Sequence, residues 1–108
     1  ASPENWEGLQ LFKNERYALA TLSAIKGNEK SMLILIKAYQ SYDPETKKQN
    51  KVKSLAFADF AVDVVGNAEI YRKAHWFKEK LLNELNYDDI LKAKLITEKL
   101  KSQFETTL

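Results

Sequence analysis

His75 is the only histidine of the chain, and Lys78 follows it three residues later. Residues three apart on an α-helix lie side by side, so the imidazole and the ammonium would share one face. An imidazole nitrogen can accept a phosphoryl group, and a neighbouring ammonium helps to neutralise the added charge. The pair His75 and Lys78 therefore defines one possible chemistry, the transfer of a phosphoryl group.

The sequence around His75 favours a structural role instead. Residues 79–81 are Glu, Lys and Leu, whereas helical bundles that transfer phosphoryl groups usually carry small Gly and Ser residues there, which make room for a docking partner. The carboxylate of Glu79 would also repel phosphate. His75 lines up with Tyr71 and Leu82 at the edge of an apolar stripe, which predicts a partly buried histidine. Phosphotransfer centred on His75 stays an alternative.

Trp76 lies outside that apolar stripe, on the side of the helix that carries Arg72, Lys73 and Lys80. An exposed tryptophan bordered by cations is typical of an interaction hot spot or of a stacking platform. The favoured interpretation is that another helix, or the N-terminal segment with Trp6, covers the indole ring, and the binding role is the alternative. The predicted partner-binding residues are Tyr39, Tyr42, Arg72, Trp76 and Lys80.

The densest basic segment is 47–53, and its lysines are Lys47, Lys48, Lys51 and Lys53. Such a run could contact phosphates, and nearby aromatic side chains could stack on bases. The chain shows neither a helix-turn-helix pattern nor a ribonucleoprotein aromatic signature. A solvated face is therefore the favoured interpretation, and a nucleic-acid-binding module that uses this segment is an alternative.

Pairs of carboxylates are weak candidates for acid–base or metal chemistry. Asp59 and Asp63 lie four residues apart on one predicted helix face, without a second pair or a histidine beside them. Asp88 and Asp89 suit a helix start, where the helix dipole favours negative charge. The chain has no cysteine and only three isolated glycines, which excludes thiolate metal sites and a phosphate-binding loop. We expect no catalytic residues, no metal and no cofactor.

Length and composition indicate one globular domain over residues 1–108. A chain of 108 residues, 44% hydrophobic and 30% charged, can bury a core without disulfides. Its net charge of +2 is too small to indicate a nucleic-acid or acidic partner by itself. The longest apolar run, 32–36, is far shorter than the roughly 18 residues that span a bilayer, so we expect no membrane span.

The absence of cysteine fits a reducing cytoplasm, and it equally fits an exported protein without disulfides. The chain begins at Ala1 and shows no basic segment followed by an apolar stretch. We expect a cytoplasmic protein, and this chain to be a piece of a longer one.

The first predicted helix starts at residues 2–4, where Ser, Pro and Glu are favourable cap, first-turn and dipole residues. Its apolar positions are Leu9, Phe12, Leu19, Leu22 and Ile25. Small alanines on this helix allow close approach by a neighbour. Gly8 costs a helix interior about 1 kcal/mol, so residues 2–8 could form a separate cap or a frayed end.

Gly27 and Asn28 are expected to end this helix and to begin a second one over 29–42. Apolar residues on most sides predict that the second helix is buried almost all round. The run 32–36 is also compatible with a strand. Asp43-Pro44-Glu45 then repeats the helix-start chemistry of residues 2–4.

The apolar segment 52–65 predicts either one long helix or a loop with a shorter helix, and its broken alternation keeps a strand possible. Gly66-Asn67 repeats the stop and start signal. The next helix carries the clearest amphipathic stripe, formed by Ile70, Ala74, Phe77, Leu81 and Leu85. The last helix opens at residues 87–89, and residues 105–108 should fray. Its core side is predicted to be Ile90, Ala93, Thr97, Leu100 and Phe104.

Two Gly-Asn signals about forty residues apart are typical of helical hairpins that repeat along a chain. With Pro44 placed at its closing proline, residues 13–44 resemble a tetratricopeptide repeat. Leu19-Ala20 then falls on the family's Leu-Gly pair and Gly27 on its inter-helix glycine.

A second stretch carries the same resemblance. Residues 71–74, followed by Phe77, are similar to the opening of the family's second helix, and residues 87–104 resemble the long helix that often closes such arrays. The resemblance implies partner binding through a concave surface and no catalytic residues.

These features predict an all-α domain of four to five helices in stacked antiparallel hairpins. An α+β fold with a strand hairpin over about 32–65 is the alternative. The predicted function is a non-enzymatic interaction or scaffold domain that binds a protein or peptide partner through a helix-lined face. Phosphotransfer at His75 and nucleic-acid binding by the lysines of 47–53 are the alternative functions.

Overall fold

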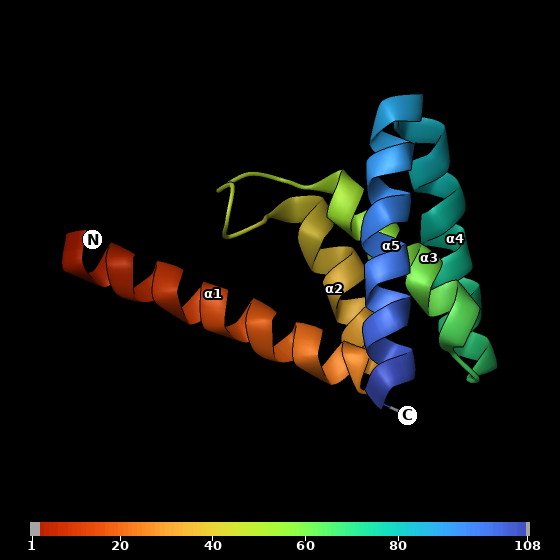
Figure 1. The fold of residues 1–108 in the computed structure, drawn as a ribbon. Helices are drawn as coiled ribbons and strands as arrows, with labels where there is room; N and C mark the ends of the chain where they lie inside the picture. Colours follow the sequence, from red (N-terminus) through yellow and green to blue (C-terminus); the bar gives the residue numbers. More distant parts are fainter. Residues whose placement is uncertain (1–2, 108) are drawn as a thin grey trace.

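A computed structural model describes residues 3–107, with side chains from 13 to 106, and these residues form five α-helices (Figure 1). The helices are α1 (Pro3–Ile25), α2 (Glu29–Ser41), α3 (Lys51–Val64), α4 (Ala68–Glu84) and α5 (Tyr87–Thr107). Within residues 3–107 there is no strand, only an isolated bridge between Asp43 and Lys48. The all-α prediction is confirmed, and the α+β alternative over 32–65 is wrong.

Asparagine side chains cap the starts of α2, α3, α4 and α5. The Oδ1 atoms of Asn28 and Asn50 accept hydrogen bonds from backbone N–H groups three residues later, at 2.9 and 3.0 Å. Asn67 accepts two such bonds at 3.0 Å, and Asn86 accepts one at 2.9 Å. Each bond satisfies an N–H that the first helical turn leaves without a partner. The predicted caps Asn28 and Asn67 are confirmed, and the predicted cap Ser2 lies outside the described residues.

The two Gly-Asn signals end their helices in different ways. Gly27 has a φ of 102°, and the N–H groups of Gly27 and Asn28 bond the carbonyls of Ala24 and Ser23 at 3.0 Å each. This is the Schellman arrangement, which favours glycine. At the second signal α3 ends through an extended Val65, and Gly66 does not adopt a positive φ. Both signals thus separate two helices as predicted, but only Gly27 ends its helix through a positive φ.

Helix α3 is the centre of the fold, because α2, α4 and α5 all pack against it. One of its sides joins the larger core through Phe57 and Phe60, and the other joins a smaller core through Leu55, which lies with Leu81 of α4 and Ala93 of α5. A helix with neighbours on several sides needs apolar residues all round. This explains why the segment 52–65 resembles both a helix and a strand in sequence.

Burial all round is a property of α3 and not of α2, contrary to the prediction. Helix α2 buries Met32, Leu35, Ile36 and Tyr39, but Ile34 on its outer side is 59% exposed. The helix lies between α1 and α4, with α3 beneath it, so its outer face meets no other helix of the described chain.

Helix α1 runs unbroken through Gly8, and its N-terminal part projects from the other helices (Figure 1). Near its C-terminal end it packs against α2 and α5, and Ala24 is fully buried there. Leu19 and Leu22 are 59% and 56% exposed, so the predicted apolar stripe of this helix is wrong at these positions. The small side chain of Ala24 allows α2 to approach α1 closely. Leu19 and Leu22 lie on the side of α1 that faces away from this contact. The side chains of Trp6, Leu9 and Phe12 lie outside the described set.

Helices α4 and α5 follow their predicted stripes. Ala74 and Leu81 of α4 are fully buried, and Ala93, Thr97 and Leu100 of α5 are at most 5% exposed. Helix α5 stays helical to Thr107, beyond the point at which fraying was expected. It packs against both α3 and α1, so the first and last helices of the described chain meet.

Candidate interaction surface

Arg72, Trp76 and Lys80 follow one another at intervals of four residues on the outer face of α4. Trp76 is 58% exposed, and its ring meets Phe77 edge to face with centroids 4.9 Å apart. The Nζ atom of Lys80 lies 5.5 Å from the centroid of the Trp76 ring. No helix of the described chain covers the indole, so the favoured interpretation that another helix buries it is wrong. The side chain of Trp6 lies outside the described residues.

The charges around Trp76 are only partly neutralised. Lys73 forms an ion pair with Glu69 at 3.2 Å, and Lys80 lies 3.9 Å from a carboxylate oxygen of Glu84. Arg72 is exposed and has no ion pair in the described part of the chain. A guanidinium and an ammonium thus flank an accessible indole, an arrangement that can bind both apolar and acidic groups of a partner.

His75 is an exposed residue, so the prediction of a partly buried histidine is wrong. Its side chain is 49% exposed, and its ring stacks on Tyr71 with centroids 5.9 Å apart. The Nε2 atom lies 3.7 Å from a carboxylate oxygen of Glu79. Lys78 is turned toward α3, where its Nζ lies 3.0 Å from Asp59. The pairing of imidazole and ammonium that phosphoryl transfer would use is therefore not formed.

Tyr39, one of the predicted contact residues, belongs to the core. It is 6% exposed, its ring meets Tyr17 edge to face at 5.2 Å, and it stacks on Phe57 at 5.8 Å. A side chain enclosed in this way offers almost no area to a partner, so the prediction of Tyr39 as a contact residue is corrected to a core role.

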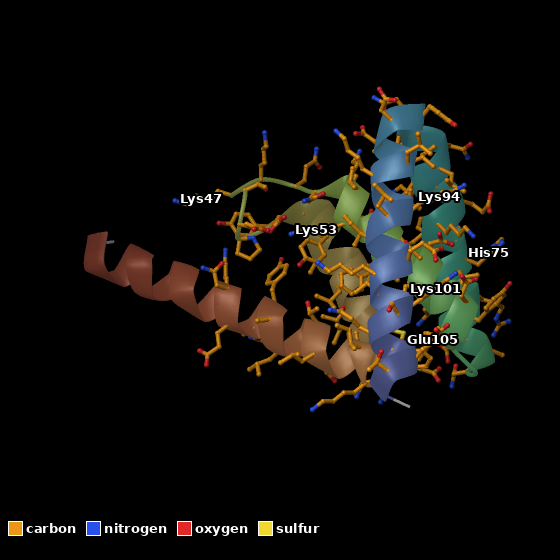
Figure 2. The ribbon with its side chains drawn as sticks, in the orientation of Figure 1. Lys47, Lys53, His75, Lys94, Lys101 and Glu105 are labelled. Carbon is orange, nitrogen blue, oxygen red and sulfur yellow. The ribbon has the colours of Figure 1, made fainter. Side chains whose placement is uncertain are left out.

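Tyr42 is half-buried at the C-terminal end of α2, and the Nζ atom of Lys13 lies 4.5 Å from its ring centroid. It directly precedes the loop that carries Lys47. Figure 2 shows Lys47 on one side of α5 and His75 on the other. The predicted contact residues thus divide into three places, which are the outer face of α4, Tyr42 at the end of α2 and the buried Tyr39.

Asp43 organises the loop between α2 and α3. Its carboxylate is 1% exposed and accepts hydrogen bonds from the Asn50 side chain at 2.8 Å and from the Glu45 N–H at 2.9 Å. The Nζ atom of Lys53 lies 3.2 Å from Asp43 and 2.8 Å from Glu45. Asp43-Pro44 does not begin a helix, because these bonds hold it in a tight turn and Asn50 caps α3 instead. Of the two predicted arrangements, the loop followed by a shorter helix is confirmed and the single long helix is wrong.

These contacts move several pKa values. Burial alone would raise the pKa of Asp43, but the hydrogen bonds from Asn50, Glu45 and Lys53 outweigh it and lower that pKa. Burial would lower the pKa of Lys53, and its contacts with Glu45, Tyr39 and Asp43 outweigh that effect and raise it. Burial, together with the charge of Asp43, raises the pKa of Tyr39.

Tyr17 completes this cluster. Burial and the charge of Asp43 raise its pKa, and its hydroxyl donates a hydrogen bond to the Tyr42 carbonyl at 2.8 Å. An open groove of about 770 Å³ runs beside the cluster between α1 and the loop. Lys53 pairs with Asp43 and Glu45, and the Tyr17 hydroxyl bonds the backbone. The arrangement fastens the loop to α1 and α3.

The lysines of segment 47–53 do not form one patch. Lys51 reaches Glu84 of α4 at 3.1 Å, and Lys53 is held by Asp43 and Glu45. Lys47 and Lys48 are exposed on the loop. Two of the four cations are thus engaged by carboxylates.

The acidic pair on α3 has a structural use. Asp59 bonds Lys78 of α4, and Asp63 bonds Lys101 of α5. The hydrogen bond to Asp63 raises the pKa of Lys101. These pairs join α3 to two neighbouring helices. Among the described residues no group of three or more His, Asp or Glu side chains is placed to hold a metal ion.

The outer face of α2 was missed from the sequence. Lys30, Ile34 and Lys37 lie at i, i+4 and i+7 and share one side of the helix. An isoleucine between two lysines at this spacing is the signal that could have indicated an exposed face with an apolar centre.

The chain was compared with protein-family models, with curated proteins and with solved structures, and no match was found in any of the three. Over residues 3–107, no helix combines the length and the apolar character needed to cross a bilayer.

Proposed function

We propose that this chain is a protein-interaction domain that binds a partner through the outer face of α4, with Arg72, Trp76 and Lys80 as the contact residues. The observation that carries the proposal is the 58% exposure of Trp76 between two cations. Tryptophan and arginine are the residues most enriched among those that dominate binding energy.

The geometry of the face supports this role. The edge-to-face contact with Phe77 and the cation of Lys80 restrict the indole ring, so the Trp76 side chain loses less conformational entropy when a partner binds. Arg72, one turn away, can form two parallel hydrogen bonds with a carboxylate of the partner. The surface is thus prepared both for apolar burial and for charge pairing.

The tetratricopeptide resemblance agrees with a binding role, and a repeat origin and a cytoplasmic location are part of this proposal. A longer parent chain with further repeats of about forty residues would support it. A parent chain without them would contradict the repeat origin. It would not bear on the proposal that the α4 face binds a partner.

The test compares the partner proteins that are captured by the wild-type chain with those captured by Trp76→Ala. Because Trp76 is exposed, the variant should keep its unfolding free energy within about 0.5–1 kcal/mol. We expect at least one bound protein to lose about tenfold or more in affinity. Tyr87→Ala is the matched control, because Tyr87 is a 73% exposed aromatic residue on α5. Equal binding by wild type and Trp76→Ala would overturn the proposal.

A further inference from the structure

Ile34 forms a ridge between two grooves on the outer face of α2. It is 59% exposed and lines both of them. The groove toward α1 has a volume of about 490 Å³, and its floor includes Ala20, Leu35 and Ala38. The groove toward α4 has a volume of about 400 Å³, with Leu33 among its apolar lining residues. The surface is therefore an apolar ridge with a depression on each side.

Basic side chains surround this ridge. Lys13 and Arg16 line the first groove, and Lys30, Lys37 and Lys73 line the second. The one acidic residue in either lining is Glu69, which pairs with Lys73 at 3.2 Å. Lys30 and Lys37 are exposed and form no ion pair within the described chain. The face thus carries a local excess of positive charge, although the net charge of the whole chain is only +2.

We propose that this face docks an amphipathic helix of a partner protein whose apolar stripe is flanked by Asp or Glu. Helices pack by placing the side chains of one into the grooves beside a ridge of the other, and the two depressions beside Ile34 fit that geometry. Carboxylates along the partner would lie against Lys30 and Lys37. The proposal concerns a different surface from the α4 face and does not depend on Trp76.

Two other classes of ligand fit the face less well. A nucleic acid would pair its phosphates with the lysines but would leave the Ile34 ridge and the apolar floors unused. A flat anionic membrane would meet the ridge but would leave the grooves beside it unfilled. A helix is the ligand that uses the apolar ridge, both grooves and the cations together.

The probe is a phage-displayed library of random peptides of about 16 residues, long enough for four helical turns, selected on the whole chain. Enriched peptides are then synthesised and titrated by fluorescence anisotropy against wild type, Ile34→Glu and Lys37→Glu. We expect acidic residues beside apolar residues at three- and four-residue spacing in these peptides. Both variants should bind them about tenfold or more weakly, and added salt should weaken binding to the wild type.

Matched controls separate this face from the rest of the surface. Leu95→Glu changes a 73% exposed leucine on α5, and Lys94→Glu changes an exposed lysine of the same helix (Figure 2). Both should bind the peptides as wild type does. Enriched peptides that lose affinity for Trp76→Ala bind the α4 face and are set aside before the titrations. The variants are on exposed positions, and their circular dichroism and thermal unfolding should match wild type.

Several outcomes would overturn the proposal. They are the absence of any enriched peptide, enriched peptides without acidic residues, and peptides whose affinity is unchanged by Ile34→Glu. The same titrations with vesicles of equal parts phosphatidylserine and phosphatidylcholine, and with single-stranded DNA, test the other ligand classes. If either binds more tightly than the peptides and is lost in Lys37→Glu, the face belongs to that ligand instead.

Discussion

The carboxylate of Asp43 and the ammonium of Lys53 lie 3.2 Å apart and join the start of the α2–α3 loop to the first turn of α3. The carboxylate is 1% exposed, whereas the lysine is 27% exposed and also pairs with Glu45. Removing the charge of Asp43 would therefore leave a buried polar site with too many donors, because Asn50 also donates to it.

We predict that Asp43→Asn lowers the unfolding free energy at neutral pH by about 1–3 kcal/mol, the cost of a buried hydrogen-bonded group that loses its partners. Urea unfolding monitored by circular dichroism measures this change. Glu45→Gln is the control, because the Glu45 side chain is 77% exposed, and it should change the free energy by no more than about 0.5 kcal/mol. Equal stability of wild type and Asp43→Asn would show that the network contributes nothing.

The same residue predicts a pH dependence. The folded-state pKa of Asp43 lies below its ordinary value of 3.8, so the folded protein binds the proton less readily than the unfolded chain does. The stabilisation is complete above about pH 4 and is lost as the pH falls through the folded-state pKa. The difference in unfolding free energy between wild type and Asp43→Asn should therefore shrink below about pH 4. A difference that stays constant down to pH 2 would contradict the lowered pKa.

Lys47 has a φ of 61°, in the left-handed region that most side chains avoid. For residues other than glycine this conformation costs about 1–2 kcal/mol. Glycine removes that cost, but it also raises the conformational entropy of the unfolded chain, which offsets part of the gain in stability. We predict that Lys47→Gly raises the unfolding free energy by about 0.5 kcal/mol. Lys48→Gly, at a position without a positive φ, should leave it unchanged or lower it. Thermal unfolding of the two variants in parallel separates these results.

The helices that were predicted best are those with one buried side. The stripes of α4 and α5 predict Ala74, Leu81, Ala93 and Leu100 as core residues, and all four are buried. Periodicity is informative there because one face of each helix meets the core and the other meets water. The same pattern placed Trp76 outside the buried stripe, but it did not show whether another helix would cover the indole.

Burial depends on neighbours, which the sequence of a single helix does not contain. The segments of α2 and α3 are both rich in apolar residues, but one face of α2 meets no other helix of the described chain. Ile34 lies on that face and is exposed, whereas Tyr39 on the same helix faces the core and is enclosed. Asp43 and Asn50 are both good helix caps by residue type. The choice of Asn50 depends on hydrogen bonds and an ion pair that form only when the loop folds back on itself.

His75 provides a test of the alternative function. Its Nε2 lies 3.7 Å from the carboxylate of Glu79, and Lys78 is held by Asp59 at 3.0 Å. The carboxylate opposes an incoming phosphate, and the ammonium that would neutralise it is occupied. We predict that incubation with acetyl phosphate yields no phosphohistidine detectable by mass spectrometry. A phosphorylated peptide containing His75, absent from His75→Gln, would make phosphotransfer the leading function instead of partner binding.

The buried hydroxyls of Ser54 and Thr97 join α3 to α2 and α5, and Thr97 can be tested with an isosteric change. Its Oγ1 donates to the Ala56 carbonyl of α3 at 3.0 Å, and the residue is 1% exposed. Thr97→Val keeps the shape and removes the bond, while Ala56 keeps its hydrogen bond within the helix. We predict a loss of about 1 kcal/mol in unfolding free energy.

Thr106→Val is the control, because the Thr106 hydroxyl is exposed and bonds Ser102 of its own helix. That variant should match wild type. If Thr97→Val matched wild type as well, the hydroxyl would make no net contribution to the packing of α5 on α3.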